Sequence, residues 1–125
     1  MTGSRTLDGG QASVEAALVL PVVVLALLLV LQTGLLIRDQ VLVTHTAREG
    51  ARVAAVEADE DAAVEAARSA AGLDPDRLSV EVGTPLASGE RVRVEIRYRA
   101  PIVVPVLSAL LDDVVLTATV TVRVE

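Results

Sequence analysis

The feature that most constrains this chain is an uncharged, apolar stretch of 22 residues from Ala16 to Ile37. At about 1.5 Å per residue, a helix of this length extends roughly 33 Å, enough to cross a hydrocarbon core of about 30 Å. Its continuous Val and Leu leave no polar side, which disfavours a helix buried in a soluble core. The sequence that follows lacks the small-residue pattern of a signal-peptidase site. We therefore predict that this stretch, residues 16–37, crosses the membrane as a helix, with a kink at Pro21 near its start.

One carboxylate, Glu15, directly precedes this apolar stretch. A charged side chain costs about 3 kcal/mol near the centre of a membrane helix and less towards its ends. A sequence that keeps a carboxylate at such a position is expected to use it. Orientation is a separate question, because one arginine precedes the stretch and three follow it closely: Arg5, Arg38, Arg48 and Arg52. Counted alone, these charges would place the C-terminal domain in the cytoplasm.

Composition excludes several classes of function. The net charge of −6 argues against a nucleic-acid binder, which would show a basic face. The chain has no Cys, so disulfides, thiol catalysis and Cys-based metal sites are excluded. His45 is the single histidine and has no second metal-ligating histidine or cysteine. We expect no catalytic residue, no metal site, no cofactor and no small-molecule substrate.

Small residues mark the helical pattern that continues beyond the apolar stretch. Apolar and small side chains recur there at spacings of three and four, with Arg48, Glu49 and Arg52 available for a polar face. Gly34, in a more polar patch near the end of the span, would allow a close helix–helix contact. Three further residues would let a neighbouring element approach closely: Ala47, Gly50 and Ala51.

A second helix is predicted from EADEDAAVEAARSAAG, residues 57–72. Asp59 is a suitable N-cap, Glu60 and Asp61 fall in the first turn, and Arg68 falls near the end, an order that complements the helix dipole. Gly72 fits the C-cap. Its mostly Ala face is expected to pack against something close and flat, such as a sheet.

Three strands are expected next, at Leu78–Val82, Arg91–Arg99 and Leu116–Glu125. Each alternates apolar and polar residues, which predicts an antiparallel sheet with one buried and one exposed face. The apolar link APIVVPVLSALLDDV is too short and too interrupted by prolines to cross a membrane. It is either a buried connector with a short helix after Pro105, or an exposed patch that docks on a partner or on the membrane surface.

The predicted fold class is therefore α+β. A long N-terminal transmembrane helix continues into a helix outside the membrane, followed by a second short helix and a three-stranded antiparallel sheet.

The residues around the carboxylate resemble a known signal. Gly10, then Gln-Ala-Ser-Val, then Glu15 and a long apolar helix are similar to the class III signal of type IV pilins and pseudopilins. Together with Pro21 and the run Ala47-Arg48-Glu49-Gly50-Ala51-Arg52, they resemble the TadE-like family of the tight-adherence (Tad) pilus system. The resemblance covers about residues 10–56.

The resemblance implies a role for each of these residues. A prepilin peptidase would cut between Gly10 and Gln11 on the cytoplasmic side and leave the apolar helix in place, making Glu15 the fifth residue of the mature chain. Glu15 would then pair with the new ammonium of a neighbouring subunit during assembly. Asp8 and Gly9 stand where the family often has a basic residue, and cutting after Gly9 would make Glu15 the sixth residue instead.

The resemblance also implies a function and a location. Gln11 in place of a bulky apolar first residue favours a minor pilin or pseudopilin, structural and non-catalytic, that takes part in pilus assembly and either enters the fibre or stays at its base. Its partners would be the prepilin peptidase, other Tad pilins or pseudopilins and the inner-membrane assembly platform. Residues 1–10 would be the leader, 11–37 the single span of the bacterial cytoplasmic membrane, and 38–125 an extracytoplasmic domain.

Two other classes of function remain open. The chain could be an uncleaved, signal-anchored module whose small domain binds an envelope or surface ligand. A membrane enzyme is the third class, and His45 is its only candidate base.

Overall fold

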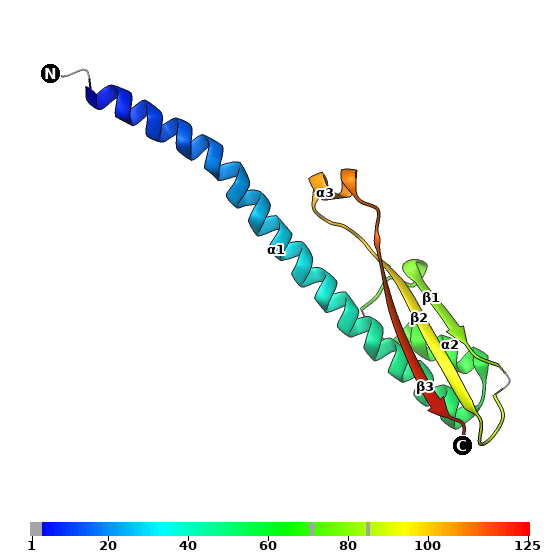
Figure 1. Cartoon of the computed structure of the whole chain (residues 1–125). Helices are drawn as coiled ribbons and strands as arrows, with labels where there is room; N and C mark the ends of the chain where they lie inside the picture. The colour runs from blue at the N-terminus through cyan, green and yellow to red at the C-terminus, as the bar shows by residue number, and fades with distance from the viewer. Residues whose placement is uncertain (1–3, 71, 85) are drawn as a thin grey trace. The chain divides into compact units, whose positions relative to one another are not determined.

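A computed structural model describes residues 4–70, 72–84 and 86–125 of the chain (Figure 1). It confirms the α+β class, the long apolar N-terminal helix, the short second helix and the three-stranded antiparallel sheet. In chain order the elements are α1 (Ser4–Glu57), α2 (Glu60–Ser69), the 3₁₀ turn η1 (Pro75–Arg77), β1 (Leu78–Val82), β2 (Arg91–Ala100), α3 (Pro105–Leu110) and β3 (Val114–Arg123).

The chain forms two compact units, each described here by itself. The first ends at Gly34, and the second is Leu35–Glu125; α1 contributes to both. The membrane span predicted from the sequence ends slightly later, at residue 37. In the first unit Pro21 lies inside α1, where its missing N–H leaves the carbonyl of Ala17 without its helical donor.

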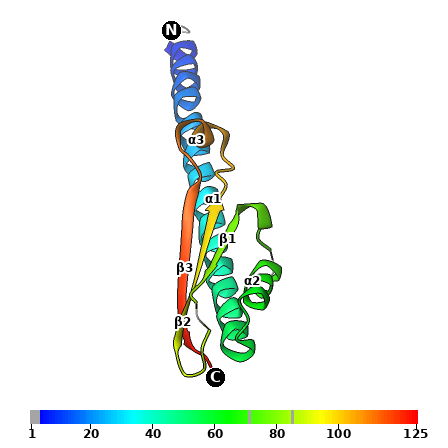
Figure 2. The ribbon, with the colours of Figure 1, turned by 90° about the vertical axis from the view of Figure 1, so that its right-hand side faces the viewer.

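In the second unit, β2 is the central strand of a sheet ordered β1-β2-β3 (Figure 2). Both pairings are antiparallel: Val94 lies opposite Val82 of β1 and Val120 of β3. The alternation of apolar and polar residues predicts one buried and one exposed face, and β2 shows both. Its apolar face is buried, whereas the four arginines of its other face are exposed. Along β3 the apolar face is only half-buried.

The core of this unit is built from small residues of the helices against larger residues of the sheet. A Cβ added to Gly50 of α1 would lie 3.2 Å from the Cβ of Ala67, 3.4 Å from the carbonyl oxygen of Ala63 and 3.5 Å from Cγ1 of Val94. Glycine thus lets α2 and β2 approach α1 closely. The fully or almost fully buried members of the core include Val43, Ala47, Ala51, Ala54, Ala63, Ala67, Val94, Ile96 and Tyr98.

Helix α2 begins as the sequence predicts and ends earlier. The Asp59 side chain accepts hydrogen bonds from the backbone N–H of Asp61 (2.9 Å) and of Ala62 (3.4 Å). The predicted C-cap at Gly72 is wrong, because Ala70 takes that position. Gly72 serves the turn beyond, where its φ of +91° is one that L side chains rarely adopt. The Ala face of α2 packs on the sheet and on α1, as expected.

The connector between β2 and β3 corrects two expectations. A short helix does follow Pro105, but α3 buries none of its residues, so the description as a buried connector is wrong for this helix. Strand β3 begins at Val114 and ends at Arg123, two residues earlier at each end than predicted. The β2–β3 ladder extends to the pair Ala100–Val114, so Val114 and Val115 also belong to the sheet.

We predict that Gly50→Val lowers the free energy of unfolding of the second unit by about 1–3 kcal/mol, because the added methyl groups overpack the contact among α1, α2 and β2. Arg48→Val is the control, since it places the same side chain on the exposed face of the same helix. Thermal unfolding followed by circular dichroism measures both variants. Equal stability of the two would contradict the packing described for Gly50.

Candidate functional site

The first unit presents an apolar helix surface that is exposed along most of its length, with Gln32 buried near its end. The window of highest mean hydropathy in α1 reaches 2.9 and buries none of its residues. Within the described ranges, one helix is long and apolar enough to cross a membrane. The exposed large apolar side chains include Leu18, Leu20, Val22, Leu27 and Val30. By length and composition, this unit is suited to lipid or to a bundle of similar helices.

The proposed cleavage and assembly residues all lie at the start of this helix. Gly10, Gln11 and Glu15 belong to α1 and are exposed. Among the described residues, no ion pair joins the Glu15 carboxylate to a cation. The nearby hydroxyl of Ser13 donates instead to the backbone carbonyl of Gly9 (3.0 Å). If lipid surrounds it, a carboxylate in this position is costly unless a cation pairs with it.

The four small residues predicted for helix packing divide into two groups. Ala47, Gly50 and Ala51 are buried in the core of the second unit, so the elements that approach them belong to the same chain. Gly34 lies apart from them in the first unit, and a Cβ added there would meet no described atom within 4 Å. It therefore remains open to another helix.

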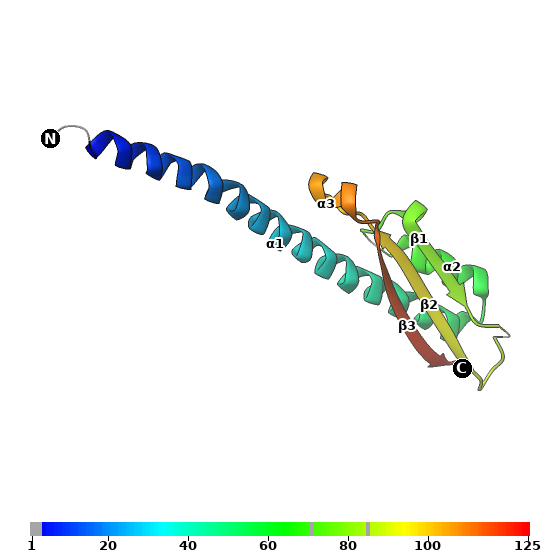
Figure 3. The ribbon, with the colours of Figure 1, turned by 45° about the horizontal axis from the view of Figure 1, so that its top comes forward.

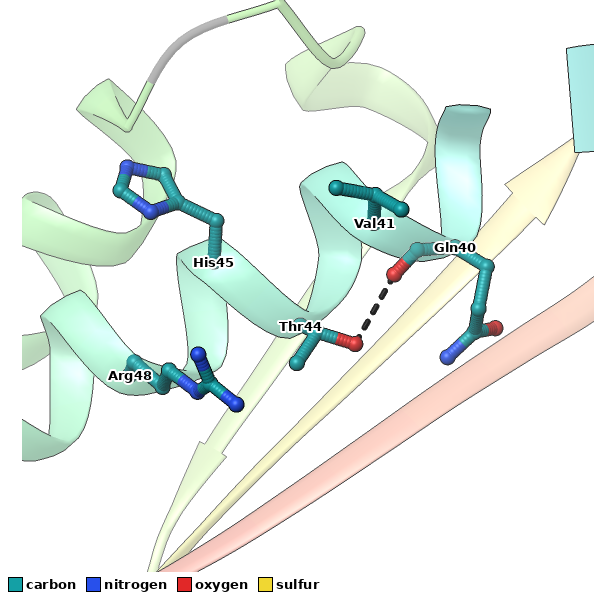
Figure 4. Close-up of a pocket in the computed structure, with 5 residues that line it drawn as sticks. All are labelled: Gln40, Val41, Thr44, His45 and Arg48. Carbon is teal, nitrogen blue, oxygen red and sulfur yellow. Dashed lines mark hydrogen bonds between the residues drawn. The ribbon is translucent and has the colours of Figure 1, made fainter. Parts of the chain in front are cut away.

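The histidine considered as a candidate base lines a hollow of about 370 Å³ on the exposed side of α1 (Figure 4). All the residues that line it come from α1: Gln40, Val41, Thr44, His45 and Arg48. The Thr44 hydroxyl donates to the backbone carbonyl of Gln40 (2.9 Å), and the His45 ring points away from it. The lining thus pairs no nucleophile with a base in the way catalysis requires.

Some acidic residues of the second unit form ion pairs with arginines on its surface. An Arg77 guanidinium nitrogen lies 2.7 Å from the Asp113 carboxylate and Arg97 lies 2.6 Å from Glu95. The hydrogen bond that the Arg77 guanidinium donates to the Asp113 carboxylate raises the pKa of Arg77. Within the described residues, no group of three or more His, Cys, Asp or Glu side chains is placed to hold a metal ion.

The sequence of residues 10–52 matches the sequence model of one protein family, described as TadE-like protein. This segment is TadE-like. The match covers Gly10 and Glu15, the apolar stretch that follows them, and the part of α1 that carries Gly50. It agrees with the resemblance found from the sequence alone. No curated protein and no solved structure matches the chain.

The match covers less than half of the chain, so it describes this segment alone. By length and composition, the helix within it is long and apolar enough to cross a membrane. The exposure of the apolar residues of α3 does not follow from the sequence. The segment is an apolar run that contains prolines and is too short to span a membrane, and such a run fits a buried connector and an exposed patch equally well.

We predict a low pKa for Glu49 that depends on Arg52. The Arg52 guanidinium donates to the Glu49 carboxylate (2.7 Å), and this hydrogen bond is the main reason that the pKa of Glu49 lies below 4.5, the ordinary value for glutamate. A carboxyl with a lowered pKa in the folded state contributes stability above its unfolded value and loses it as the pH falls through the folded value.

Arg52→Gln should therefore raise the pKa of Glu49, as measured by NMR of the side-chain carboxyl carbon. The control is Arg48→Gln, an exposed arginine of the same helix. A Glu49 pKa that does not change in Arg52→Gln would contradict the ion pair.

Proposed function

We propose that this protein is a TadE-like minor pilin or pseudopilin that takes part in assembly of a Tad-type pilus, as a structural and non-catalytic component. The observation that carries the proposal is Glu15, a carboxylate on an exposed apolar helix in the segment that matches the TadE-like family. The proposed location is the bacterial cytoplasmic membrane, with residues 1–10 in the cytoplasm and residues 38–125 outside it.

The proposed role of Glu15 follows from the electrostatics of a low-dielectric environment. Cleavage between Gly10 and Gln11 by a prepilin peptidase creates an ammonium on Gln11, four residues before the carboxylate. In a bundle of apolar helices, the ammonium of one subunit and the Glu15 carboxylate of its neighbour neutralise each other. Pairing favours assembled over isolated subunits, because an unpaired charge is costly in lipid.

A signal-anchored binding module is the second candidate function. The sheet domain supports it, because the four exposed arginines of β2 form a surface that could meet an anionic ligand. The two candidates differ in what accompanies the protein. Co-isolation with pilin-like proteins and the assembly platform supports the first, and a stable, full-length monomer supports the second.

We predict that Glu15→Ala and Glu15→Gln are inserted and cut normally but fail to assemble. Removing one partner of a buried ion pair costs about 3–5 kcal/mol, so pilus assembly should fall by two orders of magnitude or more. Electron microscopy and the sheared pilus fraction measure assembly, and membrane fractionation measures insertion.

Glu57→Ala is the matched control, because it removes an exposed carboxylate from the other end of the same helix. It should assemble like the parent protein. Normal piliation in Glu15→Gln would contradict the pairing, since glutamine has the same shape without the charge.

A further inference from the structure

The short helix α3 exposes large apolar side chains that the domain leaves uncovered. Leu110 is 75% exposed, and Val106 and Leu111 are each 57% exposed. None of the α3 residues is buried, so the helix contributes nothing to the core of its own unit. Neighbouring apolar side chains gathered on one short segment are typical of a surface that meets a partner or a membrane.

Two hydrogen bonds within the second unit place α3 at one particular end of it. The Gln40 side-chain amide donates to the carbonyl of Thr117 (3.4 Å), and the N–H of Glu125 donates to the carbonyl of Ala55 (3.0 Å). Strand β3 therefore runs alongside α1 in the same direction. Helix α3, which precedes β3, lies towards the end of the unit at which Leu35 enters it (Figure 3).

That end of the unit is joined covalently to the apolar helix of the first unit. Residue 35 directly follows Gly34, and no polar linker separates the two units. If the first unit crosses the bilayer, the second unit begins directly where that crossing ends. The end of the second unit that carries α3 is then the end nearest to the membrane along the chain, and the β1–β2 loop and the C terminus lie at the opposite end of the unit.

We propose that α3 inserts its apolar side chains into the membrane surface, at the boundary between the lipid headgroups and the acyl chains. The proposal rests on the membrane anchoring stated under Proposed function. Helices that lie in the interface bury their apolar face about 5–10 Å deep at the boundary between headgroups and acyl chains. The segment is too short to cross the membrane, so its apolar side chains enter only the surface layer of the bilayer.

Charged residues at the end of α3 limit how deeply it enters. Asp112 and Asp113 follow Leu111 directly, and the Asp113 carboxylate lies 2.7 Å from an Arg77 guanidinium nitrogen. This ion pair stays in the aqueous headgroup region while Val106, Leu110 and Leu111 enter the apolar layer. Docking at α3 fixes the tilt of the domain on the membrane before any partner subunit binds.

Depth-dependent fluorescence quenching tests the proposal, because the chain has no native cysteine. The full chain is reconstituted at high lipid excess in phosphatidylcholine vesicles as three single-cysteine variants, each carrying a polarity-sensitive fluorophore. Leu110→Cys reports on α3, Ala26→Cys on the apolar helix, and Ser88→Cys on the exposed β1–β2 loop at the opposite end. Brominated lipids quench at shallow or at deep positions of the acyl chain.

The expected result is loss of most of the Leu110→Cys emission with shallow bromines, loss of the Ala26→Cys emission with deep bromines, and no loss for Ser88→Cys. If Leu110→Cys resembles Ser88→Cys while Ala26→Cys is quenched, α3 does not dock and the inference alone fails. If Ala26→Cys is not quenched either, the membrane anchor fails with it. A blue-shifted but unquenched Leu110→Cys would mean that protein covers α3, which also overturns the proposal.

Discussion

A single carboxylate in an apolar helix is the constraint on which the proposed role of this protein depends. The helix surface around Glu15 is suited to lipid, and the carboxylate has no ion-pair partner among the described residues. Such a group is tolerated near the edge of a membrane and becomes favourable when a cation neutralises it. A new N-terminal ammonium on a neighbouring subunit would supply that cation, which links processing of the chain to its assembly.

Small side chains allow one helix to serve both units. Towards the end of α1, glycine and alanine bring α2 and the central strand β2 within van der Waals contact of the helix. A bulky residue at Gly50 would separate these layers. The second unit is thus packed on its own part of α1, and the segment from Thr117 of β3 to Glu125 runs alongside α1 from Gln40 to Ala55. This arrangement places α3 at the end of the second unit opposite the C terminus.

Local signals predict much of this fold, and tertiary contacts decide the rest. Period-two alternation predicts all three strands, and Asp59 predicts the start of α2, because both depend on neighbouring residues. The end of α2 depends instead on the turn that brings Gly72 beside Leu42, so it could not be located from the helix alone. Similarly, the sequence of an apolar segment such as α3 does not indicate whether the protein buries it or leaves it exposed. The proposed roles of Gly10 and Glu15 come from the family resemblance, since spacing alone does not reveal a second subunit.

The mature N-terminus, determined by mass spectrometry on protein from native membranes with and without the prepilin peptidase, tests the central claim most directly. The account predicts a peptidase-dependent start at Gln11, which makes Glu15 the fifth residue and provides the ammonium that it needs. A start at Gly10 would make Glu15 the sixth residue of the mature chain. A chain that keeps its first ten residues while the peptidase is present would contradict the account and leave Glu15 as an acid of a plain membrane anchor.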